Sequence, residues 1–178
     1  AFLRHATSKL RTAEDLGNIG TLGFRGEALA AIAAVSRIEI VSCETGAAHG
    51  ARLTLAGGVP GEAEAAPAPE GTTITVRDLF YNTPARLKFM RKDSAETAAV
   101  NGLMQHLALS HPDISFKFIK DGVEALLTPG DGKLDSAVYA ALGRDFARGL
   151  VPVSGSGGDI TVSGFVTAPL MGRGSRSM

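Results

Sequence analysis

The chain has 178 residues, which is enough for one full domain or for one domain and part of a second. Hydrophobic residues make up 44% of the sequence, so a real core is expected, and the single cysteine excludes an internal disulfide or a cysteine-rich metal site. The 18 basic residues balance the 18 acidic ones, so the chain is not an overtly basic nucleic-acid binder and any DNA contact depends on a local patch.

The two ends indicate a piece of a longer protein inside the cell. The chain begins at Ala1 without an initiator methionine, and residues 172–178 form a glycine- and serine-containing stretch that ends no predicted element. No apolar run is long enough to cross a bilayer, and the first residues lack the hydrophobic region of a signal peptide. We therefore expect an intracellular fragment.

The first predicted elements surround a glycine-bracketed loop. Residues 3–10 and 13–19 are expected to be short helical or loop pieces, with Thr12 as the cap of the second. The loop 23–26 then leads directly into a predicted helix over 27–35. Glycines at such a junction let several backbone N–H groups point at an anion, and the helix dipole adds partial positive charge there. The junction predicts a phosphate site, although an ordinary loop-to-helix turn has the same pattern.

Strands and helices alternate irregularly through the rest of the chain, which favours the α+β class. Predicted strands lie at 36–43, 51–55, 72–76, 114–119, 123–128, 149–153 and 160–168. The stretch 57–71, rich in Gly, Pro and Ala, is predicted to be a turn and loop. Predicted helices lie at 94–110, capped by Ser94, and at 134–142, closed by Gly143.

Three segments of the chain carry distinctive motifs. The first segment is His5-Ala6-Thr7-Ser8-Lys9, and the second is Gly23-Phe24-Arg25-Gly26-Glu27-Ala28-Leu29. The third runs over 71–89 and contains Gly71-Thr72-Thr73 and Asn82-Thr83-Pro84-Ala85-Arg86. Together they resemble the MutL family of DNA mismatch-repair proteins, which belongs to the GHKL ATPase superfamily that also holds DNA gyrase, a heat-shock chaperone and the histidine kinases. The resemblance is specific over 5–89 and looser towards the C-terminus.

The resemblance implies a fold with two parts. Residues 1–129 would be the C-terminal part of a GHKL ATPase domain, a mixed sheet covered on one face by helices and truncated at its N-terminus. Residues 130–178 would begin a second α+β domain, the ribosomal-protein-like transducer domain. The Pro- and Gly-containing cluster at 129–132 marks the predicted boundary.

The resemblance also implies which residues bind ATP. In the family the lid segment lies near the nucleotide, the glycine loop closes over it with backbone amides on the phosphates, and a threonine after a glycine helps to bind adenine. The backbone of Gly26 is expected to approach the ligand where a side chain would obstruct it. The expected ATP-binding residues are Thr7, Ser8, Lys9, Gly23, Phe24, Arg25, Gly26, Leu29 and Thr72.

Some of these assignments leave alternatives open. Arg25 either contacts phosphate or pairs with a carboxylate that fixes the loop. Lys9 either donates a charge-assisted bond to phosphate or lies on a solvated helix end. We expect structural roles for Glu27, whose charge suits a first helical turn, and for His5, which is surrounded in sequence by no catalytic constellation of cysteine, serine or carboxylate residues.

A small basic cluster follows the third segment. Lys88, Arg91 and Lys92 lie where the resemblance implies one candidate DNA-contacting surface, acting on phosphates rather than on base edges. A solvated face explains the same cluster equally well.

The family's catalytic and metal-binding motifs are expected to lie outside this chain. The resemblance places upstream a helix with the catalytic glutamate and the Mg²⁺-binding asparagine, and an Asp-Asn-Gly-x-Gly segment that binds adenine. We therefore predict no catalytic and no metal residue here, and no turnover by these 178 residues alone.

For the parent protein the resemblance implies Mg²⁺-dependent ATP hydrolysis that drives closure and homodimerisation. This cycle would couple a mismatch-recognition protein to a downstream nuclease or helicase, on DNA, in the cytoplasm and nucleoid of a bacterium. Two alternatives remain: another GHKL ATPase such as a type II topoisomerase subunit or a histidine kinase, and a DNA-binding matchmaker module without catalysis. The segment 82–86 argues against the first, and ATP-independent DNA affinity would indicate the second.

Overall fold

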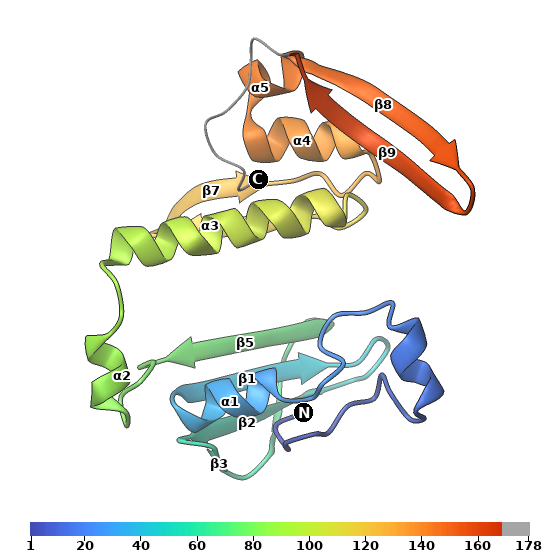
Figure 1. Ribbon diagram of the computed structural model, residues 1–178. Helices are drawn as coiled ribbons and strands as arrows, with labels where there is room; N and C mark the ends of the chain where they lie inside the picture. The colour runs from blue at the N-terminus through green and yellow to red at the C-terminus, as the bar shows by residue number, and fades with distance from the viewer. Residues whose placement is uncertain (169–178) are drawn as a thin grey trace. The chain divides into compact units, whose positions relative to one another are not determined.

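The computed structural model describes residues 1–168, which fall into two compact units (Figure 1). The first unit is Ala1–Met90 and the second begins at Arg91. Helices and strands are mixed along the chain, which confirms the α+β class, and every strand pair among the described residues is antiparallel. The predicted boundary between 129 and 130 lies within the second unit, so the assignment of 1–129 and 130–178 to two domains stays a prediction.

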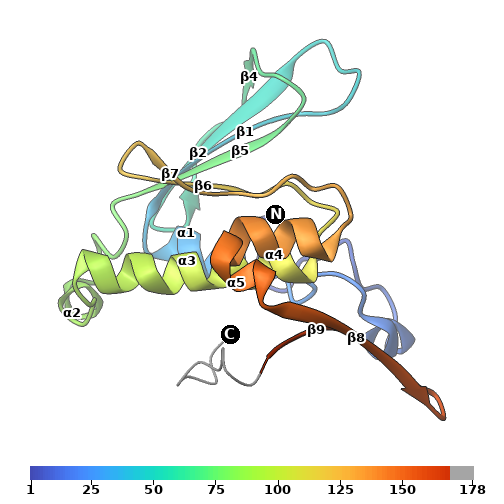
Figure 2. The ribbon, with the colours of Figure 1, turned by 90° about the horizontal axis from the view of Figure 1, so that it is seen from above.

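One antiparallel sheet forms the frame of the first unit. Its strands are β1 (Arg37–Cys43), β2 (Gly50–Ala56), β3 (Val59–Pro60), β4 (Glu64–Ala66) and β5 (Gly71–Arg77). The order is β3-β2-β1-β5, and β4 pairs with β2. Figure 2 shows β1, β2 and β5 running side by side.

The three long strands confirm the sequence predictions, but the stretch 57–71 is more than a loop. It contains β3 and β4, which pair with β2 through Pro60 and through Glu64 to Ala66. Proline and glycine lower the strand propensity of this stretch, so the local sequence does not indicate strands here. The strands form because β2 offers backbone hydrogen-bond partners to them. Pairing with β2, rather than local sequence preference, therefore determines that these two short segments form strands.

Helix α1 (Ala28–Ala34) covers one face of this sheet. The core cluster of the unit is Ala33, Ile38 and Leu55, with Phe2 and Leu53 packed against it. The register places Ile38 opposite Leu55, so both side chains lie on the face that α1 covers. This contact sets the position of the glycine loop, because that loop ends where α1 begins.

The segment after β5 closes the other end of α1. The backbone N–H of Phe80 donates to the carbonyl of Val35 at 2.7 Å, and the Asn82 amide nitrogen donates to the carbonyl of Ala34 at 2.9 Å. These bonds satisfy carbonyl groups that a helix end leaves without partners. A short helix follows, α2 (Pro84–Lys88), which the sequence analysis did not predict. Proline at its first turn suits a helix start.

The expected cap at Thr12 is wrong. The 3-10 helix η1 (Glu14–Asn18) begins after Ala13, and no side chain caps it. Instead, the Asp15 carboxylate accepts the backbone N–H groups of Arg11 and Thr12 at 2.8 and 2.9 Å. These backbone bonds stabilise the ionised carboxylate and lower the pKa of Asp15 below its usual 3.8.

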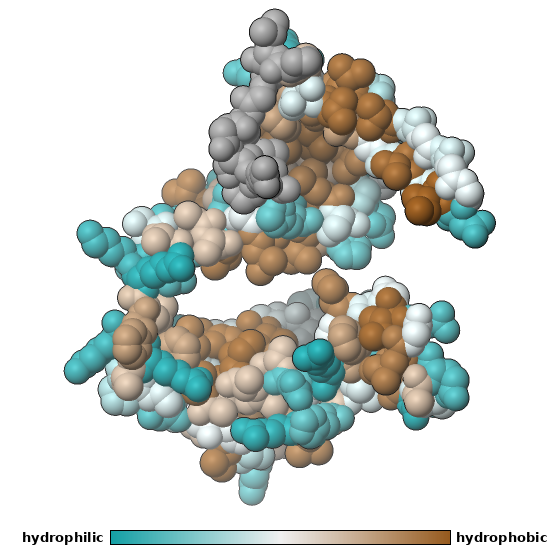
Figure 3. Space-filling model, viewed as in Figure 1, coloured by the Kyte–Doolittle hydropathy of each residue, from teal (hydrophilic) through white to brown (hydrophobic). Residues whose placement is uncertain are grey.

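The second unit contains three helices and two hairpins within its described residues. The helices are α3 (Asp93–Ser110), α4 (Leu134–Leu142) and α5 (Arg144–Arg148), and the hairpin strands are β6 (Lys117–Lys120), β7 (Val123–Leu127), β8 (Leu150–Gly157) and β9 (Ile160–Thr167). Apolar surface is visible along the β8–β9 hairpin (Figure 3). No helix among residues 1–168 is long and apolar enough to cross a membrane.

Several predictions for this unit hold and others need correction. Gly143, at φ +87°, ends α4 as predicted, and α5 follows it without having been predicted. Ser94 is not the cap of α3: Lys92 occupies that position, and the Glu96 carboxylate accepts the backbone N–H of Arg91 at 3.0 Å. An acidic side chain thus replaces the expected hydroxyl.

Thr128 joins the β6–β7 hairpin to the segment before it. Its side chain is 2% exposed, and its hydroxyl oxygen accepts the backbone N–H of Phe116 at 2.9 Å. Its carbonyl accepts the hydroxyl of Ser115 at 2.7 Å. Leaving an N–H group inside the protein without a hydrogen-bond acceptor costs free energy of folding, and Thr128 supplies that acceptor for Phe116.

Replacement of Thr128 by valine should therefore destabilise the second unit by about 1–3 kcal/mol, because the Phe116 N–H loses its acceptor at a partly buried position. Hydrogen exchange of this unit in a urea series measures the free energy of opening. The exposed Thr161→Val is the control and should change it by less than about 0.5 kcal/mol. Equal effects of the two changes would contradict this account of Thr128.

Candidate anion-binding site

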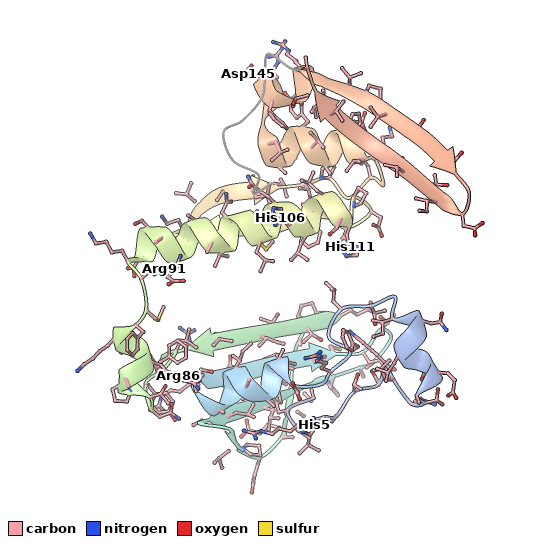
Figure 4. All side chains as sticks on the ribbon, in the orientation of Figure 1. His5, Arg86, Arg91, His106, His111 and Asp145 are labelled. Carbon is pink, nitrogen blue, oxygen red and sulfur yellow. The ribbon has the colours of Figure 1, made fainter. Side chains whose placement is uncertain are left out.

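Two segments of the first unit interlock beside the start of α1. We call residues 5–9 the lid segment and residues 22–27 the glycine loop. The backbone N–H of His5 donates to the carbonyl of Gly26 at 3.1 Å, and His5 Nδ1 lies 3.1 Å from Glu27 Oε1. At the other end, Lys9 Nζ donates to the carbonyl of Leu22. Figure 4 labels His5 on the N-terminal segment near α1.

Gly26 is the tightest point of this interlock. It has φ +62°, and a Cβ added there would lie 2.2 Å from the carbonyl oxygen of Ala6. A Cβ at Gly26 would therefore meet the backbone of the lid segment, which sequence alone does not place beside it. The expected approach of Gly26 to a ligand stays a prediction.

A cavity of about 680 Å³ lies over the two segments. Most of the predicted ATP-binding residues line it, together with residues of the helix start. The lining residues are Ala1, Ala6, Thr7, Ser8, Lys9, Gly23, Arg25, Gly26, Glu27, Ala28 and Leu29. Phe24 and Thr72 are the predicted residues that are not part of this lining.

The cavity carries two cations and one anion. Lys9 and Arg25 supply positive charge, and Glu27 supplies negative charge that is paired with His5. Thr7 and Ser8 add hydroxyl groups, and the Thr7 hydroxyl oxygen accepts the backbone N–H of Lys9 at 3.2 Å. Hydroxyls, an ammonium and a guanidinium are the groups that bind phosphate oxygens.

The two alternatives for Arg25 now differ in their support. Among the described residues, no carboxylate forms an ion pair with Arg25. Its guanidinium carbon instead lies 5.8 Å from the ring centroid of Phe24, within the range of a cation–π contact. Phe24 thus contacts the side chain of Arg25 rather than the cavity.

Thr72 lies in β5, directly opposite Ser42 of β1. Their hydroxyl oxygens are 2.7 Å apart, so the side chain of Thr72 takes part in a cross-strand hydrogen bond. Its predicted role at adenine stays a prediction.

The predicted DNA-contacting residues belong to both units. Lys88 ends α2 in the first unit, whereas Arg91 and Lys92 precede α3 in the second; all three are exposed (Figure 4 labels Arg91). Their role in DNA binding stays a prediction.

Glu14 and Asn18 are a glutamate and an asparagine four residues apart, the two residue types that the resemblance places on a catalytic helix outside this chain. They lie in η1, a 3-10 helix with three residues per turn. Residues four apart do not share a face of such a helix, so the two side chains do not act together as they would on an α-helix. Among residues 1–168, no group of three His, Cys, Asp or Glu side chains is placed to hold a metal ion.

Comparisons of the sequence identify MutL proteins as relatives. The chain is 46% identical over 178 residues to the DNA mismatch repair protein MutL of Symbiobacterium thermophilum, a match that covers 99% of this chain and 28% of the relative. It is 43% identical over 177 residues to MutL of Streptococcus pneumoniae, of which it covers 27%. The chain thus spans less than a third of the length of these relatives. No protein-family profile matches it.

The fold has the same relatives. The Aquifex aeolicus MutL ATPase domain complexed with ADP superposes with a TM-score of 0.71 at 26% identity, over 88% of this chain and 60% of that one. Together, these matches show that the chain is similar in sequence to part of MutL proteins and in fold to part of a MutL ATPase domain.

The Gly26→Ala substitution tests the interlock. The added methyl group would meet the carbonyl of Ala6, and a left-handed backbone costs an L-residue about 1–2 kcal/mol. The lid segment should therefore detach, and trypsin should cut faster after Lys9 and Arg11. Gly20→Ala is the matched control, because nothing lies within 4 Å of a Cβ there. Equal cleavage of the two variants would show that Gly26 does not hold the lid segment.

Proposed function

Because this chain is similar in sequence to part of MutL proteins, we propose that it forms the phosphate-binding part of the ATP site in a mismatch-repair ATPase. The observation that carries the proposal is the cavity between the lid segment and the glycine loop, lined by Lys9 and Arg25 and by two hydroxyls. The ADP complex of the Aquifex relative supports a nucleotide as its ligand.

In this proposal Lys9 and Arg25 supply the charge that holds the phosphates. The Lys9 ammonium now donates to a neutral carbonyl, that of Leu22, and would exchange it for a phosphate oxygen. A phosphate oxygen carries negative charge, so the ammonium gains there an electrostatic attraction that a neutral carbonyl does not offer. Gly23, with φ +72°, leaves the approach to the Lys9 ammonium open, since a Cβ there would come within 3.3 Å of it.

Hydrolysis needs groups beyond those described. Among residues 1–168 no group of three His, Cys, Asp or Glu side chains is placed to hold a metal ion, and the Mg²⁺ ligand is proposed to lie elsewhere in the parent. In the proposed parent enzyme the metal ligand and the base that activates water come from segments outside this chain, as does most of the adenine site, to which Thr72 contributes. Residues 1–129 then belong to the ATPase domain and 130–178 begin the transducer domain.

The remaining functions of the parent follow from the same assignment. We assign it Mg²⁺-dependent ATP hydrolysis, closure and homodimerisation on DNA, communication between a mismatch-recognition protein and a nuclease or helicase, and a place in the bacterial cytoplasm at the nucleoid. Lys88, Arg91 and Lys92 would contact DNA phosphates. A DNA-binding module without catalysis is less well supported, because the solved relative is an ATPase domain with ADP.

Calorimetric ADP binding tests the proposal, on this chain and on a form extended to the length of its MutL relatives. The extended form should bind ADP, and Lys9→Met should weaken binding by about tenfold or more, because a charge-assisted bond contributes about 1.5–3 kcal/mol. The control Lys133→Met removes an exposed lysine of the second unit and should leave the affinity unchanged. Absence of ADP binding, or indifference to Lys9, would refute the proposed site.

A further inference from the structure

We propose that His5 and Glu27 are a positioning pair that fixes the lid segment on the glycine loop and preforms the phosphate cavity. Neither residue need contact the nucleotide. The inference rests on the proposed function for its ligand, but the pair itself is a feature of the protein without ligand.

The backbone of His5 points to such a constraint. His5 has φ +61°, a left-handed conformation that is uncommon for a residue other than glycine. An unfavourable backbone of this kind persists where several contacts determine it together. Here those contacts are the hydrogen bond from the backbone N–H of His5 to the Gly26 carbonyl, at 3.1 Å, and the contact of the His5 imidazole with the Glu27 carboxylate, also at 3.1 Å.

The negative charge of Glu27 is unfavourable for an anion in the cavity, and His5 reduces this effect. The Glu27 carboxylate lines a cavity whose other charged groups, Lys9 and Arg25, suit an anion. An unpaired carboxylate there would repel a phosphate, since like charges at short range are unfavourable. The imidazole of His5 gives the carboxylate a partner within hydrogen-bonding distance. The pair therefore links the two segments and reduces repulsion within the cavity.

The pair matters most once Lys9 changes its partner. The lid segment is held at one end by His5 and at the other by the bond from Lys9 to the carbonyl of Leu22. When Lys9 turns to a phosphate, that second bond is lost. His5, Glu27 and the contact of Gly26 with Ala6 then hold the lid segment in place, with Thr7 and Ser8 over the cavity.

The experiment is a double-mutant cycle on the extended protein, with ADP as the probe. The variants are Glu27→Ala, His5→Asn and their combination, because asparagine tolerates the left-handed backbone at position 5. Each single change should weaken ADP binding about two- to fivefold, the range that measured exposed ion pairs give, since the side chains are 77% and 51% exposed. The combined variant should be no weaker than either single one.

Two further readouts separate positioning from a general loss of stability. With ATP, the variants should raise KM by the same factor and change kcat less than twofold, because the pair touches no reacting atom. Glu27→Gln, which keeps an acceptor for the imidazole N–H, should restore part of the affinity. Glu44→Ala and His49→Asn are the matched controls, because both residues are exposed and their side chains make no hydrogen bond or ion pair within residues 1–168; both variants should bind ADP normally.

Trypsin cleavage after Lys9 and Arg11 in the 178-residue chain tests the pair without nucleotide. Both single variants should be cut faster than the controls, and the combined variant no faster than either. If the unsubstituted extended protein does not bind ADP, the proposed function is wrong. The cleavage rates alone then test whether His5 and Glu27 form a positioning pair. Cleavage equal to that of the controls, or effects that multiply in the combined variant, would overturn the pairing of His5 with Glu27.

Discussion

The backbone contact between Gly26 and Ala6 is the constraint on which the candidate site depends. Because a Cβ at Gly26 would lie 2.2 Å from the Ala6 carbonyl, only glycine lets the lid segment lie against the loop before α1. The bonds from His5 and Lys9 then pin both ends of the lid segment. The cations and hydroxyls of one cavity are brought together by this fit of two chain segments.

The rest of the first unit positions that contact. Packing of Ala33 on Ile38 and Leu55 fixes α1 on the sheet, and the bonds from Phe80 and Asn82 hold its C-terminal end. The start of α1 is therefore set by the core, and the glycine loop is set by α1. A short helix of this kind has little stability of its own, so tertiary packing must supply it.

Much of this frame could be predicted from the sequence, because periodicity and glycine signals are local. The helix at 27–35 and the strands at 36–43, 51–55 and 72–76 are examples, and the motifs also located the lid and the glycine loop. The missed features are contacts between distant residues: the β3 and β4 pairings, the carboxylates that replaced the expected caps, and the pairing of His5 with Glu27. The requirement for glycine at position 26 is another contact between distant residues, because Ala6, which lies against it, is 20 residues away in sequence.

Hydrogen-exchange mass spectrometry of residues 5–9 and 22–27 tests the central claim most directly. If the two segments form one interlocked element, their amides are protected together without nucleotide, lose protection together in Gly26→Ala, and gain protection together when ADP binds to the extended protein. Independent exchange of the two segments, or protection of the glycine loop by ADP while the lid segment stays unchanged, would contradict the account.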